Sequence, residues 1–318
     1  MKLLTCIPCM ALLLMALVGH GLGAQPQIPA PSATTIPPAP EAQSQSTAPV
    51  VDTAAKAVVP GLIELLIDSR WETRSWAADH LGKLGADAKD AVPALNGLAR
   101  DCEPAARQAA ADALGRIGPA AEKAAPVLAS LLRDPTAAVR KAAAAALIQI
   151  GPAAKAAVPE ATALLDDPCW DVRRQAADAL GGIGKPAQEA IPALTRRLDD
   201  CDPAVRISAA TALTTVYPKP DAAVPLVVKL LHDEHPGVRA LTAELLGQVG
   251  PVAKGSIPAL TEALSDCEYR VRIAAAKALG EMGKAASGAF PAVAALLRDN
   301  VDDVRTEALA AMVEIKGM

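Results

Sequence analysis

A 33-residue repeat constrains this chain more than any other feature of its sequence. Three residue types each keep one phase through eight consecutive units, without an insertion or deletion. Self-similarity at such a period is typical of solenoid proteins, in which each unit packs only on its neighbours. The proline series is Pro60, Pro93, Pro126, Pro159, Pro192, Pro225, Pro258 and Pro291. The aspartates are Asp68, Asp101, Asp134, Asp167, Asp200, Asp233, Asp266 and Asp299, and the arginines are Arg74, Arg107, Arg140, Arg173, Arg206, Arg239, Arg272 and Arg305.

Each unit carries the pattern of two helices. In the second unit the apolar residues Ala106, Ala110, Leu114 and Ile117 follow the spacing of one helix face. Glycine and proline follow them, which is the usual order of residues at a helix end. The recurring proline lies near the start of a shorter first helix, where its missing N–H does no harm. Since no unit contains an alternating β-branched run, the repeat predicts an all-α fold.

The composition agrees with thin layers of closely packed helices. Hydrophobic residues make up 52% of the 318 residues, but aromatic residues only 2%. Alanine is abundant and is the strongest helix former. The net charge of −4, with both signs interspersed, excludes a whole-chain basic surface for nucleic acid or anionic membranes.

These observations predict an α–α solenoid built from eight helix pairs over residues 52–318. Small residues such as Ala77 and Ala110 are expected to permit close helix approach. The large core side chains are expected to be Leu81, Leu114, Leu147, Leu180, Leu213, Leu246, Leu279 and Met312.

The N-terminal region has a different character. Residues 1–24 resemble a signal peptide, because a short apolar run, Met10 to Val18, precedes small residues that end at Ala24. Residues 25–51 are rich in Pro, Ala, Ser and Thr and predict an extended linker outside the fold. We therefore expect an exported protein, periplasmic, envelope-bound or extracellular, without a transmembrane segment after signal removal. An uncleaved N-terminal anchor is the alternative.

Three motifs connect the repeat with a known family. They are Ala-Val-Pro-Ala-Leu at 91–95, Asp-Pro-x-x-x-Val-Arg at 134–140 and Ala-Ala-x-Ala-Leu-Gly-x-x-Gly at 176–184. With them the chain resembles HEAT repeats of the short phycobilisome-lyase-like class. The resemblance implies that the solenoid is a right-handed α–α superhelix of the armadillo/HEAT type. Most members of that class are binding scaffolds, while a few handle bilin chromophores or hydroxylate a lysine derivative with iron. The resemblance also implies that the Asp68 and Arg74 series form a ladder between neighbouring units. We interpret this ladder as structural rather than as an anion or metal site.

The sequence contains no convincing catalytic constellation. His232-Asp233-Glu234-His235 is the densest group of metal-ligand types, but it lies in a predicted turn and includes a ladder aspartate. The His-Glu dipeptides of the iron-dependent relatives are absent. The repeat spacing places Cys102, Cys169, Cys201 and Cys267 too far apart for disulfides, so four free thiols are expected. We predict no cofactor and no metal.

The most informative candidates for recognition are the rare aromatic residues. Trp71, Trp170 and Tyr269 share one repeat phase and are 99 residues apart. Tryptophan and tyrosine are favoured anchors at protein interfaces. Trp71 and Trp76 have a second interpretation, as a cover for the first unit. The residues predicted to contact a partner, on a concave face lined by second helices, are Trp71, Trp76, Asp79, Asp112, Arg116, Trp170, Arg174, Asp178, Glu244 and Tyr269.

The sequence thus favours a non-catalytic scaffold that presents an extended helical surface to a protein or peptide. The alternative is a lyase-like or deoxyhypusine-hydroxylase-related protein that acts on a chromophore or a protein substrate. A third interpretation is a structural element of the cell envelope, tethered through the proline-rich segment. A solvated surface with no partner competes with all three.

Overall fold

The computed structural model describes residues 50–317, with side chains from residue 57 onward. The predicted signal peptide and nearly all of the predicted linker lie outside the described residues. The first helix begins at Val50. The first helices are α1 (Val50–Leu65), α3 (Val92–Leu98), α5 (Ala125–Leu131), α7 (Val158–Leu164), α9 (Ile191–Arg197), α11 (Val224–Val227), α13 (Ile257–Ala263) and α15 (Phe290–Ala295). The second helices are α2 (Trp71–Lys83), α4 (Pro104–Ile117), α6 (Ala137–Ile150), α8 (Trp170–Ile183), α10 (Pro203–Val216), α12 (Pro236–Val249), α14 (Tyr269–Glu281) and α16 (Asp302–Lys316).

Short 3-10 helices connect one unit to the next. They are η1 (Gly85–Ala91), η2 (Gly118–Ala124), η3 (Gly151–Ala157), η4 (Lys185–Ala190), η5 (Pro220–Ala222), η7 (Gly250–Ser256) and η8 (Gly283–Ala289), while η6 (Val228–His232) and η9 (Leu296–Arg298) extend α11 and α15. Gly118 has a φ of +70°, a conformation in which a side chain would be strained, and it ends α4. Pro93 lies in the first turn of α3, as the sequence predicted. The predicted all-α solenoid of helix pairs is confirmed over the described residues.

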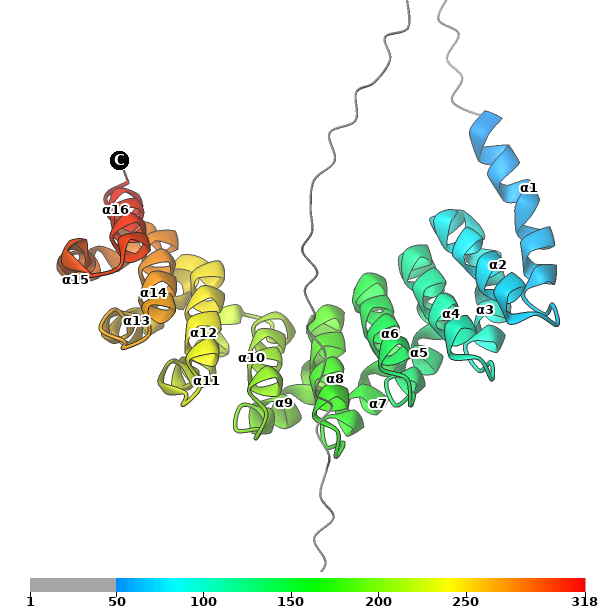
Figure 1. Cartoon of the computed structure of the whole chain (residues 1–318), viewed down its shortest axis with the longest axis horizontal. Helices are drawn as coiled ribbons and strands as arrows, with labels where there is room; N and C mark the ends of the chain where they lie inside the picture. The colour runs from blue at the N-terminus through cyan, green and yellow to red at the C-terminus, as the bar shows by residue number, and fades with distance from the viewer. Residues whose placement is uncertain (1–49, 318) are drawn as a thin grey trace, which may run out of the picture. The chain divides into compact units, whose positions relative to one another are not determined.

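The helices form two layers. Figure 1 shows the second helices side by side in chain order, from α2 to α16. Contacts between neighbouring second helices are far more extensive than contacts between neighbouring first helices. The leucine series from Leu81 to Leu279 is buried between the layers, as predicted, whereas Met312 in α16 is only partly buried. The second helices therefore form the more tightly packed layer.

Glycine explains this tight packing. A Cβ placed on Gly115 of α4 would lie 2.9 Å from the Cα of Ala146 in α6, so only glycine fits there without displacing the backbone. The same close approach recurs at four other contacts between neighbouring second helices. The glycines at this phase are Gly82, Gly115, Gly181, Gly247 and Gly280. They bring neighbouring second helices into direct backbone contact.

We call each contact between neighbouring second helices a joint. At the α6–α8 joint the small and the large residue exchange positions. Ile148 of α6 occupies the glycine phase, and Gly182 of α8 faces it. A Cβ on Gly182 would lie 2.7 Å from the Cα of Ile148, so the glycine accommodates the isoleucine. The α6–α8 contact is nevertheless less extensive than the contacts on either side of it.

One stretch has the length and mean hydropathy of a membrane span. It runs from Ala137 to Leu164 and comprises α6, η3 and α7. Its backbone is broken at Gly151, which has a φ of +62°, and 56% of its most apolar window is buried among neighbouring units. Burial in the solenoid core therefore accounts for its apolar character.

Candidate protein-binding surface

The repeated aspartates and arginines connect the turns of neighbouring units. In α8, Arg173 donates from Nε and Nη2 to both carboxylate oxygens of Asp200 in the next unit, at 2.8 and 2.7 Å. Its Nη1 donates to the carbonyl oxygen of Asp167 in its own turn, at 2.9 Å. Both side chains of the pair are buried. One guanidinium thus holds its own turn and the following turn together.

The carboxylate of each pair also shapes its own turn. Oδ1 of Asp200 accepts a hydrogen bond from the backbone N–H of Asp202 at 3.0 Å. Burial acts to raise the pKa of Asp200, but the bonds from Arg173 and from this N–H outweigh it and lower the pKa overall. The same two-pronged pair forms at Arg74–Asp101, Arg107–Asp134, Arg206–Asp233, Arg239–Asp266 and Arg272–Asp299.

The expected pairing of Arg140 with Asp167 is wrong. Arg140 donates instead to Asp171, one helical turn further along, at 2.7 and 3.1 Å. Asp167 lies 3.6 Å from Arg133 and accepts from the N–H of Cys169. The displaced pair and Ile148 at the glycine phase both belong to α6. Both deviations therefore fall on the α6–α8 joint.

The two outermost members of the series also lack a ladder partner in the described residues. Asp68 accepts a hydrogen bond from the N–H of Arg70 at 2.8 Å. Arg305 forms an ion pair with Asp302 on its own helix and donates to the carbonyl oxygen of Asp299 at 2.7 Å. Their contacts are confined to their own units.

The three aromatic residues of one phase each occupy the first position of a second helix. Trp71 begins α2, Trp170 begins α8 and Tyr269 begins α14. The exposed fractions are 39% for Trp71 and 47% for Trp170, whereas Tyr269 is partly buried. Tryptophan and tyrosine are favoured anchors at protein interfaces. These residues mark the edge of the second-helix layer beside the turns.

Tyr269 lines a groove of about 360 Å³ between the starts of α12 and α14. His235 and Pro236 form the opposite side, and Arg270 lies beside the tyrosine, with its Nε 3.2 Å from the phenolic oxygen. His235 and Arg270 were not among the predicted contact residues. They follow the recurring turn aspartate by two and four residues, positions that vary between units, so the repeat pattern alone gave no reason to select them.

Trp76 has a different environment. It is 50% exposed, and its ring stacks on His80 of the next helical turn, with centroids 3.9 Å apart. At the same phase Ala142 and Ala274 are buried against the preceding second helix. Trp76 therefore lies on the side of α2 that would face a preceding unit, which agrees with its interpretation as a cover.

The predicted charged residues of the first two units form a local ion network. Asp79 pairs with Lys83 at 2.6 Å and with Arg116 of the next unit at 2.7 Å, and both bonds lower its pKa. Burial raises the pKa of the neighbouring Asp112. Because these charges largely satisfy one another, this part of the surface offers little net charge to a partner.

A second network lies on α8. Asp171 accepts hydrogen bonds from Arg174 at 3.1 Å and from Gln175 at 2.9 Å, besides those from Arg140. Arg174 also donates to Asp178 at 2.9 Å, and burial raises the pKa of that carboxyl. Glu244 on α12 is exposed. The structure thus places Arg174 and Asp178 together, near Trp170, but not beside Glu244.

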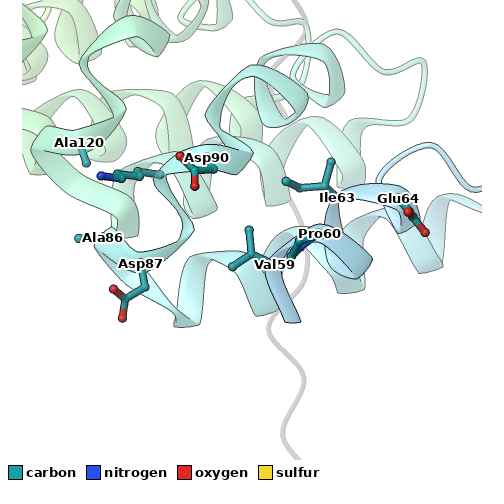
Figure 2. Close-up of a pocket in the computed structure, with 9 residues that line it drawn as sticks. Val59, Pro60, Ile63, Glu64, Ala86, Asp87, Asp90 and Ala120 are labelled. Carbon is teal, nitrogen blue, oxygen red and sulfur yellow. The ribbon is translucent and has the colours of Figure 1, made fainter. Parts of the chain in front are cut away.

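A larger groove of about 770 Å³ lies in the layer of first helices (Figure 2). Val59, Pro60 and Ile63 of α1 form one side, and residues of η1, including Asp90, lie across from them. None of the predicted contact residues lines this groove. Its wall carries charges of both signs and contains no serine, threonine, cysteine or histidine.

No group of three or more histidine, cysteine or acidic side chains suited to a metal occurs among the described residues. His232 lies 4.0 Å from Glu262, and Nδ1 of His235 accepts from the N–H of Gly237 at the start of α12. Cys102, Cys169, Cys201 and Cys267 are exposed free thiols, as the repeat spacing predicted.

Comparison with solved structures supports the architecture. The protein Kap121p, in its complex with Nup53p, matches with a TM-score of 0.59 and 17% identity, over 84% of this chain and 34% of that chain. The complex of CpcE and CpcF of phycocyanin lyase from Nostoc sp. matches at 24% identity and a TM-score of 0.45, over 90% and 100% of the two chains. Human deoxyhypusine hydroxylase matches at 21% identity and a TM-score of 0.35, over 85% of this chain and 100% of that chain. At these identities the likeness to Kap121p shows the fold alone.

Comparison with characterised protein sequences gives no significant match. The family model for HEAT repeats matches residues 59–148, 125–214, 191–254 and 224–313, which together span almost the whole solenoid. This match agrees with the resemblance inferred from the three sequence motifs. The chain therefore belongs to the HEAT-repeat family.

Proposed function

We propose that this protein is a non-catalytic scaffold that binds a protein or peptide along the second-helix layer. The observation that carries the proposal is the placement of Trp71, Trp170 and Tyr269 at the first position of α2, α8 and α14. Aromatic anchors supply large contact areas at a low entropic cost. A row of anchors three units apart would favour an extended partner.

The rest of the second-helix layer is consistent with a preorganised binding surface. Ladder pairs fix the turns beside the anchors, and glycine contacts fix most of the helices. Preorganisation reduces the entropy that binding costs. A HEAT-repeat neighbour in the solved structures, Kap121p, is itself seen bound to another protein, Nup53p.

The test is affinity capture with the wild-type chain and with Trp170→Ala and Tyr269→Ala. Lys141→Ala is the matched control, because Lys141 is an exposed residue of α6 that is not among the proposed anchors. We expect a partner that the wild type and the control retain and that both aromatic variants lose. Retention of the same partner by all four proteins, with unchanged circular dichroism, would contradict the proposal.

The same preparation distinguishes a scaffold from an enzyme. Iron or a chromophore that copurifies in stoichiometric amount would favour the lyase-like or hydroxylase-like alternative. Metal analysis and a visible absorption spectrum measure this directly. We expect neither, because the described residues present no metal-ligand cluster.

We also propose that the chain is exported and that its signal peptide is removed after Ala24. The sequence of residues 1–24 supports this proposal. N-terminal sequencing of the protein from its native host is expected to begin at Gln25. A chain that retains Met1 and stays attached to membranes would support an uncleaved anchor instead.

A further inference from the structure

The contact between α10 and α12 differs from every other contact in the second-helix layer. At each of the other joints a glycine occupies one of two positions that face each other, 34 residues apart in the sequence. At the α10–α12 joint these positions hold Thr214 and Gln248. The facing pairs with a glycine are Gly82 and Arg116, Gly115 and Gln149, Ile148 and Gly182, Gly181 and Thr215, Gly247 and Glu281, and Gly280 and Glu314.

The connection that enters the sixth unit is also irregular. Four of the second helices before and after α10 are followed by a glycine with a φ between +62° and +71°. After α10 this position holds Tyr217, whose φ of −61° and ψ of 138° give an extended backbone. A tyrosine would be strained in the glycine conformation. The next first helix, α11, is α-helical over only four residues and continues as the 3-10 helix η6, whereas α9 and α13 are α-helical over seven.

These changes reduce the packing at the joint. Of all neighbouring second helices, α10 and α12 share the least extensive contact. Leu241 of α12 is 47% exposed, whereas Ala274 and Ala142 at the same phase are 2% and 6% exposed. At this joint Leu241 therefore leaves an apolar side chain half exposed.

The ladder pair is intact at this joint. Arg206 donates to both oxygens of Asp233 at 2.7 Å, and both side chains are buried. The pair ties the start of α10 to the turn before α12, but Thr214 and Gln248 lie toward the opposite ends of the two helices. The joint is thus held firmly at one end and weakly at the other.

We propose that the α10–α12 joint is a hinge about which the segment of residues 218–317 bends relative to the segment of residues 57–217. The Arg206–Asp233 pair is the pivot. Bending changes the separation between Trp170 and Tyr269, which lie on opposite sides of the hinge, so one chain can fit partners of different length. The motion itself does not depend on the proposed function and is measured without a partner.

The native cysteines provide the probe. Cys201 and Cys267 lie on opposite sides of the hinge, whereas Cys102 and Cys201 lie on the same side, and all three are exposed. Spin labels are attached to one pair at a time in the full chain, with the remaining cysteines replaced by serine. Double electron–electron resonance then gives the distribution of distances for each pair.

We expect a broader distribution for Cys201–Cys267 than for Cys102–Cys201, although the first pair spans fewer units. Thr214→Gly and Gln248→Gly each restore a glycine to the α10–α12 joint. Both are expected to narrow the Cys201–Cys267 distribution and to leave the Cys102–Cys201 distribution unchanged. Gln149→Gly is the matched control, because its joint already contains Gly115, and it should narrow neither. Gln248 is exposed, so Gln248→Gly is expected to fold. It therefore tests the hinge even if Thr214→Gly does not fold.

Two results would overturn the hinge. One is an equal width for both pairs in the wild-type chain. The other is a Gln248→Gly variant that folds, by circular dichroism, and keeps the wild-type width for Cys201–Cys267.

Discussion

Helix α10 packs between two neighbours by different means. Toward α8 it has three kinds of contact: the Arg173–Asp200 pair, the close approach of Gly181, and a hydrogen bond from Oγ1 of Thr215 to the carbonyl oxygen of Gly181 at 2.9 Å. Toward α12 it keeps only the ladder pair and a reduced apolar contact. In a solenoid each interface contributes its own term to stability, so one weak interface makes bending local. The glycine phase, rather than the ladder, therefore distinguishes a rigid joint from a flexible one.

Removal of a ladder carboxylate has the largest expected effect. Asp200→Ala and Asp233→Ala each leave a buried guanidinium unpaired, and we expect each to lower the free energy of unfolding by about 3 kcal/mol. The two variants should differ in cooperativity, because little else holds the α10–α12 joint. Urea denaturation is expected to show one transition for Asp200→Ala and two for Asp233→Ala.

Asp167→Ala is the control for this pair of variants, since Arg140 binds Asp171 instead. Asp167→Ala is expected to cost about 1 kcal/mol, from the loss of one turn hydrogen bond and of the pairing with the exposed Arg133. The α8–α10 and α10–α12 joints would be equally strong if Asp200→Ala and Asp233→Ala both unfolded in two transitions, or both in one.

The second prediction concerns the glycine phase. A Cβ on Gly247 would lie 2.9 Å from the Cα of Ala278 in α14. We expect Gly247→Ala to destabilise the chain by about 1–3 kcal/mol, because overpacking outweighs the helix propensity of alanine. Thr214→Ala, at the same phase of the α10–α12 joint, is expected to change stability by less than about 1 kcal/mol. Thermal unfolding measures the stability of both variants. An equal loss of stability in the two would show that the glycine phase does not distinguish the joints.

The third prediction concerns acid. Burial acts to raise the pKa values of Asp101, Asp134, Asp200 and Asp266, but bonds from an arginine and from a turn N–H together outweigh it and lower them in the folded chain. A lowered folded pKa means that the stabilisation is complete above the unfolded pKa, about 4, and is lost as the pH falls through the folded value. The free energy of unfolding is therefore expected to be nearly constant from pH 7 to 5 and to fall below pH 4.

This fall should be smaller in Asp200→Ala, which has already lost one such carboxylate. A pH profile in Asp200→Ala that parallels the wild type would argue against a role of this pair in acid stability.

The repeat made the fold predictable, because one phase of prolines and two of charged residues define eight equal units. The aromatic positions were also predictable, since Trp71, Trp170 and Tyr269 stand out in a chain with few rings. The pairing of Arg140 was not, because Asp171 competes with Asp167 from one helical turn away, and spacing alone cannot rank the two. The α10–α12 joint was missed for a related reason. Thr214 and Gln248 become informative only when the structure shows which two phases face each other.

The reach of the ladder arginine has a consequence for how such a chain can change in length. Each guanidinium spans from the carbonyl of its own turn to the carboxylate of the next, so one inserted residue in a second helix would rotate the arginine away from both. The single displaced pair, Arg140 with Asp171, moves by a full helical turn, the shift that preserves the facing side. A gene for this protein can therefore grow or shrink by whole 33-residue units far more readily than by single codons within them.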